Sequence, residues 1–233
     1  SKRIMSQMKD DLRLPKEPIH IECFDNSNIQ GANPVAACVV FKNGKPSKKE
    51  YRHYNIKTVT GPDDFASMEE IVFRRYKRLL DENTSLPQLI VIDGGKGQLS
   101  SAIKEIEKYE DCNTKILSLV KGPDRNSKYD DVLYLCDGKI IRMDLEQEAK
   151  RLLQFVRDES HRFALSRSKK RRKKVTHSTL DEIKGIGSKN KKVLLRHFGG
   201  IESLRKASID QIKSIQGIGS MRAKLIHDHF NGQ

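Results

Sequence analysis

Two aspartates each end a short apolar segment of this chain. Asp25 ends the segment 19–25, and Asp93 ends the apolar run in PQLIVIDGG. If the two segments are neighbouring strands of one sheet, both carboxylates project into the crevice at the strand ends, where ligands usually bind. Like charges that close are costly unless a divalent cation neutralises them. The pair therefore suggests a Mg²⁺ or Mn²⁺ site of the kind that hydrolyses phosphodiesters, and the alternative is a turn residue or helix cap at each position.

The segment that follows Asp93 is rich in glycine. Gly94, Gly95 and Gly97 would let a phosphate backbone come near, and Lys96 among them is a candidate DNA contact. The segment is not a Walker A loop, because it contains no GK[ST] sequence. For one acid alone the turn interpretation is favoured, so the choice depends on whether the chain also binds DNA.

Two other candidates are ambiguous from the residues alone. His161, in RDESHRF, falls on the polar face of an expected helix together with Gln154 and Arg157. This periodicity favours an ordinary exposed histidine. Asp64 stands beside Asp63 at the start of another expected helix, where an aspartate commonly serves as the N-cap.

The C-terminal third contains an internal repeat. LDEIKGIGSKNKKVLLRHF (180–198) resembles IDQIKSIQGIGSMRAKLIHDHF (209–230), with Gly-Ile-Gly in both copies. The pattern resembles a tandem helix-hairpin-helix motif, in which glycines allow a tight turn and the next helix N-terminus faces a DNA phosphate. A turn with only protein contacts is the alternative, which the positive charge disfavours. The candidate DNA-binding residues are Gly185, Gly187, Lys189, Lys191, Lys192, Gly217, Gly219, Arg222 and Lys224.

Charge supports a polyanionic partner. The net charge is +14, and residues 165–233 hold 17 Lys and Arg against 5 Asp and Glu. Nucleic acid and an anionic membrane surface are both suitable partners for such a region. The sequence contains no run of about 18 apolar residues, so no membrane span is predicted. If this basic C-terminal region binds DNA, a metal site at Asp25 and Asp93 is favoured over two separate turn or cap residues. The four cysteines have no C-x-x-C spacing, which predicts reduced thiols in a cytoplasmic protein. Since the chain does not begin with Met, we expect a fragment.

Hydrophobic periodicity predicts the order of elements. Strands are expected at 19–25, 35–42, 48–56, 115–120, 132–135 and 139–142 and in PQLIVIDGG, with helices after Asp63, at 98–109 and at 144–166. This order predicts an α/β fold, a mixed sheet flanked by helices, followed by a small all-α domain. The expected domains are a tail or linker (1–18), the α/β domain (19–166), a flexible basic linker (167–177) and the repeat domain (178–233).

Five motifs in order resemble the C-terminal half of the UvrC family, the incising subunits of the bacterial nucleotide excision repair nuclease. They are IECFDNSNIQG, GPDDFASMEEIVFRRYKRL, PQLIVIDGGKGQLSSA, LLQFVRDESHRFALSRSKKRRKK and the terminal repeat, spanning about 19–230. The resemblance implies an RNase H-like endonuclease domain with a tandem helix-hairpin-helix domain, in a bacterial cytoplasmic enzyme. It implies a 5′-side incision at a lesion in double-stranded DNA, in a complex with UvrB bound through a segment absent from this chain.

The resemblance also implies a catalytic set. Asp25, Asp93 and His161 take the places of the family's two aspartates and histidine, and Asp64 that of a further acid. Asp25 and Asp93 would hold Mg²⁺ or Mn²⁺, with His161 as a further ligand or a proton-transfer group. The family commonly has histidine where this chain has Asn28, which leaves the role of that position open. A non-catalytic DNA-binding module on the same scaffold is the alternative function.

Overall fold

The computed structural model of the chain describes residues 2–27, 35–59, 63–109, 113–124 and 126–232, apart from the side chains of 168–179. The chain divides into two compact units, Ser1–Ser166 and Arg167–Gln233. Asn28, the position where the chain departs from the related family, lies outside the described residues, as does Cys112. The three described cysteines are free thiols.

The described strands of the first unit form one mixed sheet. Its order is β3-β2-β1-β5-β6-β7-β8, and β4 pairs with β2. Both β1 and β6 run parallel to β5, whereas the other pairs are antiparallel. The strands are β1 (His20–Ser27), β2 (Val35–Lys42), β3 (Lys45–Pro46), β4 (Arg52–Asn55), β5 (Leu89–Asp93), β6 (Lys115–Val120), β7 (Asp131–Cys136) and β8 (Lys139–Met143). The predicted mixed sheet is thus confirmed.

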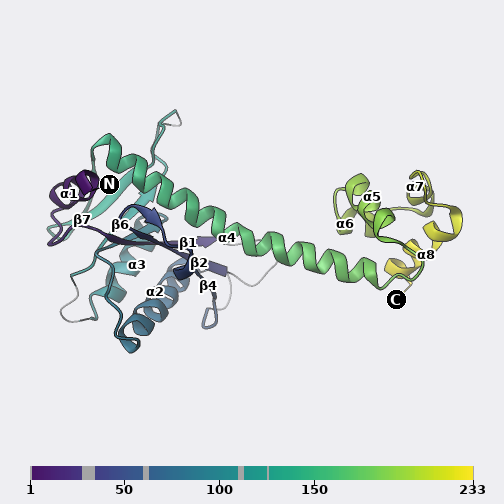
Figure 1. The fold of residues 1–233 in the computed structure, drawn as a ribbon, viewed down its shortest axis with the longest axis horizontal. Helices are drawn as coiled ribbons and strands as arrows, with labels where there is room; N and C mark the ends of the chain where they lie inside the picture. Colours follow the sequence, from purple (N-terminus) through teal and green to yellow (C-terminus); the bar gives the residue numbers. More distant parts are fainter. Residues whose placement is uncertain (1, 28–34, 60–62, 110–112, 125, 233) are drawn as a thin grey trace. The chain divides into compact units, whose positions relative to one another are not determined.

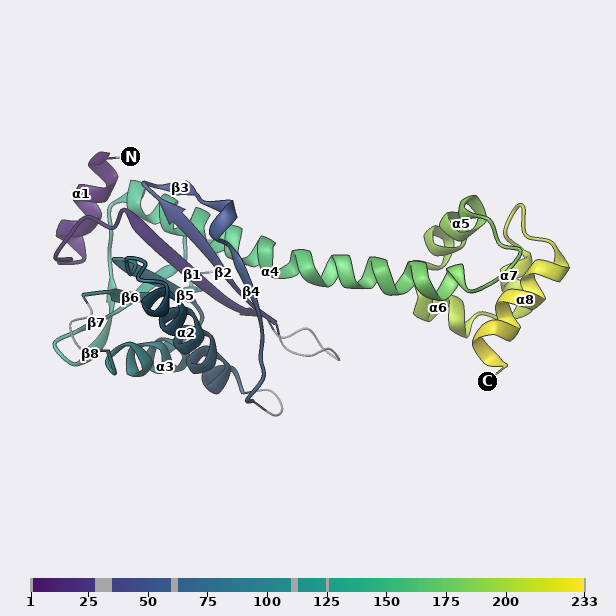
Figure 2. The ribbon, with the colours of Figure 1, turned by 60° about the horizontal axis from the view of Figure 1, so that its bottom comes forward.

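Helices cover both faces of this sheet (Figures 1 and 2). Helices α2 (Asp64–Asp81) and α3 (Lys96–Ile106) lie on one face, and the first turns of α4 (Gln147–Asp181) lie on the other. Because both faces are covered, the central strand β5 is a continuous apolar run whose first four residues are buried. Side chains of β1 alternate between the faces, so that Glu22 contacts Arg75 of α2 while Cys23 contacts Ser160 of α4.

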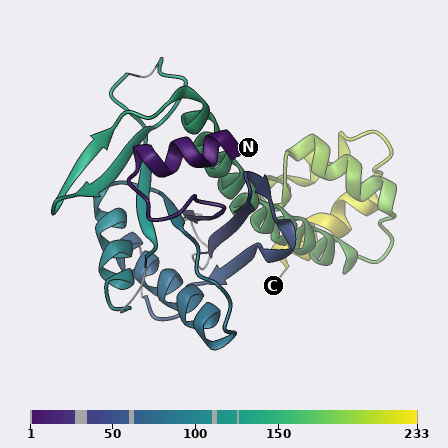
Figure 3. The same cartoon turned by 60° about the vertical axis from the view of Figure 1, so that its left-hand side comes forward.

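The N-terminal residues form a packed helix, so the prediction of a tail at 1–18 is wrong. Helix α1 (Lys2–Asp11) buries Met5 and Met8 in the same core as the sheet, and Leu12 follows them. The hydroxyl of Tyr134 donates a 2.9 Å hydrogen bond to the carbonyl of Leu12, and Figure 3 shows α1 beside the first turns of α4. The three apolar residues recur at helical spacing, so one face of a helix can bury them together.

Two-residue hairpin turns join β2 to β3 and β7 to β8, and one predicted strand is shorter than expected. The turns at Asn43-Gly44 and Asp137-Gly138 have positive φ angles between 48° and 76°, as a two-residue hairpin requires. The segment 48–56 begins with a 3₁₀ turn (Lys48–Glu50), and β4 starts only at Arg52. The alternating pattern therefore predicted the strand but not where it begins.

Helix α4 continues beyond the first unit to Asp181. The backbone of the predicted flexible linker, 167–177, is helical, so that prediction is wrong. Lysine and arginine favour helix, and a helix already started can continue at little cost through such residues. No helix in the described part of the chain is long and apolar enough to cross a bilayer.

The second unit is all helical, as predicted. After the end of α4 it contains α5 (Ser188–Phe198), α6 (Ile201–Lys206), α7 (Ile209–Lys213) and α8 (Ser220–Asn231). Its small core is aliphatic and consists of Leu180, Ile183, Ile186, Leu194, Leu204, Ala207, Ile212, Ile215, Ile218, Ala223 and Ile226. The two copies of the repeat contribute equivalent isoleucines to this core, which explains why the repeat is visible in the sequence.

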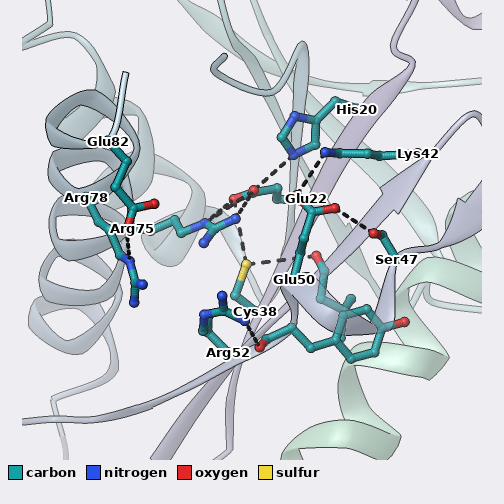
Figure 4. A network of polar contacts seen from close by, with 12 residues as sticks. His20, Glu22, Cys38, Lys42, Ser47, Glu50, Arg52, Arg75, Arg78 and Glu82 are labelled. Atoms are coloured by element: carbon teal, nitrogen blue, oxygen red, sulfur yellow. Dashed lines mark hydrogen bonds and ion pairs between the residues drawn. The ribbon is translucent and has the colours of Figure 1, made fainter. Parts of the chain in front are cut away.

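A buried ion pair joins the sheet to α2 (Figure 4). The guanidinium of Arg75 donates to both carboxylate oxygens of Glu22, at 2.6 Å from Nη2 to Oε1 and 3.0 Å from Nε to Oε2. His20 Nε2 lies 3.0 Å from Glu22 Oε1, and the Cys38 thiol donates to Oε2. Burial alone would raise the pKa of Glu22, but His20 and Arg75 lower it below its usual value. The carboxylate is therefore charged and held by its partners.

We predict that Arg75→Ala destabilises the first unit by about 3–5 kcal/mol, because the Glu22 carboxylate would remain buried without its partner. Urea unfolding followed by tyrosine fluorescence measures this, since all six tyrosines lie in the first unit. Arg78→Ala is the matched control, because Arg78 lies on the same helix and forms an exposed pair with Glu82. It should cost less than about 1 kcal/mol. Equal losses for both variants would contradict the structural role of the buried pair.

Candidate functional site

The two strand-ending aspartates lie side by side. Strands β1 and β5 are parallel neighbours, and Asp25 is the register partner of Asp93. Register partners of parallel strands project their side chains to the same face of the sheet. Since Cys23 contacts α4, Asp25 and therefore Asp93 also point to that face. The structure thus brings together the two acids that the sequence predicted to meet.

His161 joins the two acids from α4. Its Nδ1 lies 3.2 Å from Asp25 Oδ2, and one ligand atom from each of Asp25, Asp93 and His161 lies within 4.8 Å of the others. The helix is held in place one residue earlier, where the fully buried Ser160 accepts a hydrogen bond from the Cys23 thiol at 3.3 Å. Within the described residues, this is the one group of three or more such side chains suited to a metal ion. We call it the acid–histidine group.

Burial and repulsion both raise the pKa of the acids. Burial is the main cause of the raised pKa of Asp25, and the neighbouring carboxylate of Asp93 raises it further, to about 6. Burial also raises the pKa of Asp93, although the Arg157 guanidinium opposes this rise. A cation between the two acids would remove the repulsion. Two carboxylates and an imidazole are ligands that Mn²⁺ accepts readily, and the carboxylates also suit Mg²⁺.

Arg157 belongs to the site although the sequence pattern did not single it out. Its Nε lies 3.4 Å from Asp93 Oδ1 and 3.5 Å from Asp130 Oδ2. Arg157 and His161 stand one turn apart on α4, so the same helix face meets both acids. The four-residue spacing between Arg157 and His161 is the sequence feature that could have identified Arg157 as a site residue. Arg157 also connects the end of β5 to the residue before β7, where Asp130 lies.

Asp64 is outside the acid–histidine group. The N-cap of α2 is Asp63, whose Oδ1 accepts hydrogen bonds from the amides of Phe65 and Ala66 at 3.1 and 3.0 Å. Asp64 is the first residue of the helix, and its main-chain carbonyl accepts a 3.3 Å hydrogen bond from Asn26 Nδ2. The start of α2 is therefore linked to the residue that follows Asp25, through the backbone of Asp64.

The glycine-rich segment after Asp93 is more closely packed than its composition suggests. A Cβ atom on Gly97 would overlap the Phe65 ring, and one on Gly94 would overlap the side chain of Gln98. Gly95 has open space beside it and caps α3, and the exposed Lys96 begins that helix. Two of the three glycines thus make room for protein side chains, which corrects the expectation that all three leave space for a phosphate.

The two Gly-Ile-Gly turns of the second unit have the same backbone geometry. Gly185 and Gly217 have φ angles of +91° and +89°, which only glycine adopts without strain. The second glycine of each turn is the N-cap of the following helix, α5 or α8. The central isoleucines are buried, so the glycines on either side of each are exposed. Each turn therefore exposes the main chain of its two glycines to solvent.

The basic residues predicted to bind DNA differ in how available they are. The ammonium of Lys191 lies 2.7 Å from the Asp181 carboxylate, and its side chain is 16% exposed. The other four are exposed residues in the first two turns of α5 and α8, namely Lys189, Lys192, Arg222 and Lys224. Lys191 thus has a carboxylate partner, whereas the three other lysines are exposed and Arg222 donates a 3.4 Å hydrogen bond to the Gly217 carbonyl of its own turn.

We predict that Asp25→Asn stabilises the metal-free protein at pH 8 by up to about 3 kcal/mol. The folded-state pKa of Asp25 is about 6, above its ordinary value of 3.8, so the folded state binds this proton more tightly than the unfolded chain. The contribution of Asp25 to stability is therefore full below the ordinary pKa and is lost as the pH rises through about 6. Urea unfolding in EDTA at pH 8 and pH 4 measures the difference between variant and wild type.

The difference should shrink to near zero at pH 4, where Asp25 is protonated and resembles asparagine. Asp144→Asn is the control, because that side chain is 92% exposed and the substitution should change stability little at either pH. A stability difference that is the same at both pH values would contradict the raised pKa of Asp25.

Comparison with known proteins gives consistent matches for both units. The family model of the UvrC RNase H endonuclease domain matches residues 9–165, and a helix-hairpin-helix model matches 181–233. UvrABC system protein C of Flavobacterium johnsoniae is 53% identical over 214 residues, which are 91% of this chain and 35% of that protein. The protein of the same name from Bacteroides thetaiotaomicron is 47% identical over 213 residues, again 91% of this chain and 35% of that protein.

The chain spans about a third of the length of the curated relatives it matches. A solved structure of Ciona intestinalis endonuclease V in complex with DNA aligns with a TM-score of 0.44 and 11% identity, over 72% of this chain and 95% of that one. The UvrC family model alone covers more than half of the chain. The chain belongs to the UvrC RNase H endonuclease domain family.

Proposed function

We propose that this chain is a metal-dependent DNA endonuclease that makes the 5′-side incision at a lesion during nucleotide excision repair. The acid–histidine group carries the proposal. Three side chains of types that bind metal ions, from two strands and a helix, converge at the carboxyl ends of β1 and β5. Membership of the UvrC family supports the same activity. The substrate is double-stranded DNA with a lesion, in a complex with UvrB, in the bacterial cytoplasm.

Asp25 and Asp93 are proposed to hold Mg²⁺ or Mn²⁺ through their carboxylates. The bound ion would lower the pKa of a coordinated water and stabilise the charge that develops on the phosphate. Arg157 orients Asp93 from the side of β7, and Cys23 and Ser160 fix α4 relative to β1. Both acids are thereby positioned before DNA arrives, so little reorganisation is needed when the phosphate binds.

His161 is proposed to ligate the ion or to transfer a proton to the leaving oxygen. Its side chain is 48% exposed while that of Asp25 is 6% exposed, so the imidazole lies between the buried acid and the solvent side where DNA would bind. Contact with the Asp25 carboxylate orients the ring. Asp64 is proposed to assist from the start of α2, which the Asn26 hydrogen bond links to β1.

The second unit is proposed to grip the DNA backbone. Main-chain N–H groups at the two Gly-Ile-Gly turns and the lysines after them suit phosphate oxygens. Such contacts carry no base information, so this unit would add affinity and not sequence preference. Cleavage would then be placed by the lesion and the UvrB complex.

We predict that Asp25→Asn and Asp93→Asn each abolish nicking and weaken Mn²⁺ binding, because each removes a charged ligand from the acid–histidine group. His161→Ala should lower the nicking rate by about 10²–10⁴-fold, the range for a lost general acid or base. Plasmid nicking in Mn²⁺ and electron paramagnetic resonance titration of Mn²⁺ measure the two effects. Asp144→Asn, which changes an exposed acid, serves as the control.

Unchanged nicking by Asp25→Asn would refute the assignment of the acid–histidine group. Complete absence of nicking by the wild-type chain, with Mn²⁺ bound and DNA bound, would instead favour a non-catalytic DNA-binding module. The two outcomes are distinguishable because the first needs an active wild type and the second an inactive one.

We predict that Lys189→Ala combined with Lys224→Ala lowers the salt dependence of DNA binding. Each lost phosphate contact should reduce the slope of log K against log salt by about 0.9, so the pair should reduce it by about 2. Fluorescence anisotropy at several salt concentrations measures the slope. Arg196→Ala combined with Lys206→Ala removes the same charge from exposed positions away from the two turns. An equal change of slope in both double variants would contradict a grip centred on the turns.

A further inference from the structure

We propose that Phe65 is a base-stacking residue, whose exposed ring receives an unpaired base of the strand that binds at Asp25 and Asp93. The inference rests on the proposed nuclease function and adds a class of substrate to it, DNA whose bases are locally unpaired near the cut. It follows from the exposure of this ring, from how the ring is held and from where it lies.

The Phe65 ring is exposed although the helix that carries it has a buried apolar face. Phe65 is 56% exposed, although α2 buries Met68, Ile71 and Val72 within the next two turns. Contact of an aromatic ring with water is unfavourable. An isolated exposed apolar residue can be incidental, but the surroundings of this ring set it apart.

The ring packs against a glycine of the neighbouring helix. Its edge atoms Cδ1, Cε1 and Cζ lie so close to Gly97 of α3 that any Cβ at that position would overlap them. The Phe65 amide donates a 3.1 Å hydrogen bond to Asp63 Oδ1, which fixes the start of α2. The position of the ring is therefore set by contacts on one side, while more than half of the residue faces solvent.

The ring lies next to the segments that follow both acids. Asp64, the residue before Phe65, accepts a main-chain hydrogen bond from Asn26, the residue after Asp25. Gly97, which the ring covers, is four residues after Asp93, and the exposed Lys96 stands beside it. Phe65 and Lys96 lie at the starts of α2 and α3, by the carboxyl ends of β1 and β5. A strand that reaches the acid–histidine group on the α4 face and continues over these strand ends would thus pass a positive charge and an aromatic ring.

Aromatic rings bind nucleic acids by stacking on base faces. Both faces of a base are covered in a paired and stacked duplex, and they become available only where pairing is disrupted. A fixed ring at these strand ends therefore favours a strand whose bases are already unstacked. Because every base has such a face, the ring would select for disrupted pairing and not for sequence.

The test compares Phe65→Ala, Phe65→Tyr and Phe73→Ala in the complete chain. Phe73 is the matched control, since it is 45% exposed on the same helix. Binding to a duplex with a short unpaired bubble and to the fully paired duplex of the same sequence is measured by fluorescence anisotropy in Ca²⁺. Single-turnover nicking of both duplexes is measured in Mn²⁺, and Mn²⁺ affinity by electron paramagnetic resonance.

Phe65→Ala should lose about tenfold to a hundredfold of the preference for bubble DNA, with unchanged Mn²⁺ affinity, while Phe65→Tyr and Phe73→Ala keep the preference. Equal affinity of Phe65→Ala and wild type for bubble DNA would overturn the proposal. So would an equal loss for both duplexes, or weakened Mn²⁺ binding. If the bubble preference depends on Phe65 but wild type nicks neither duplex, the stacking role stands and the proposed nuclease function fails.

Discussion

The in-register parallel pairing of β1 and β5 is the constraint on which the rest of the site depends. It places Asp25 beside Asp93 on one face of the sheet, where burial raises the pKa of both carboxylates and the charge of Asp93 raises that of Asp25 further. A single-residue shift between these strands would turn one of the acids to the opposite face. The covering helix α4 then supplies His161 to one acid and Arg157 to the other. These positive or polar groups reduce the repulsion without removing it.

Strand β1 carries two carboxylates with opposite roles. Glu22 faces α2 and is bonded through both oxygens to the Arg75 guanidinium, which helps to lower its pKa. Asp25, three residues later, faces α4, its hydrogen-bond partner among the described residues is the His161 imidazole, and its pKa is raised. A carboxylate that is paired with a cation of the protein stabilises the fold. One whose charge the protein does not fully compensate is available to bind an added cation. The acid–histidine group thus has a stability cost that the buried pair of Glu22 does not share.

Local patterns predicted most of the elements, and tertiary contacts decided the rest. The apolar runs of β5 and β6, the Asn-Gly turn and the Gly-Ile-Gly repeat were visible because each has its own residue signature. Helix α1 was missed because Pro15 and Pro18 suggest a tail, although Met5 and Met8 have helical spacing. His161 looked like an ordinary polar-face residue, since nothing in the periodicity of α4 shows that β1 and β5 end beneath it. Only family resemblance singled it out, and Arg157 was found only in the fold.

Anomalous diffraction from crystals grown with Mn²⁺ tests most directly whether Asp25 and Asp93 bind a metal ion. It locates the ion without relying on activity, and therefore separates the metal site from the reaction assigned to it. We expect an anomalous peak bound by carboxylate oxygens of Asp25 and Asp93, with the His161 imidazole at or next to the ion. A Mn²⁺ peak bound elsewhere, with the Asp25 and Asp93 carboxylates free of the ion, would contradict it.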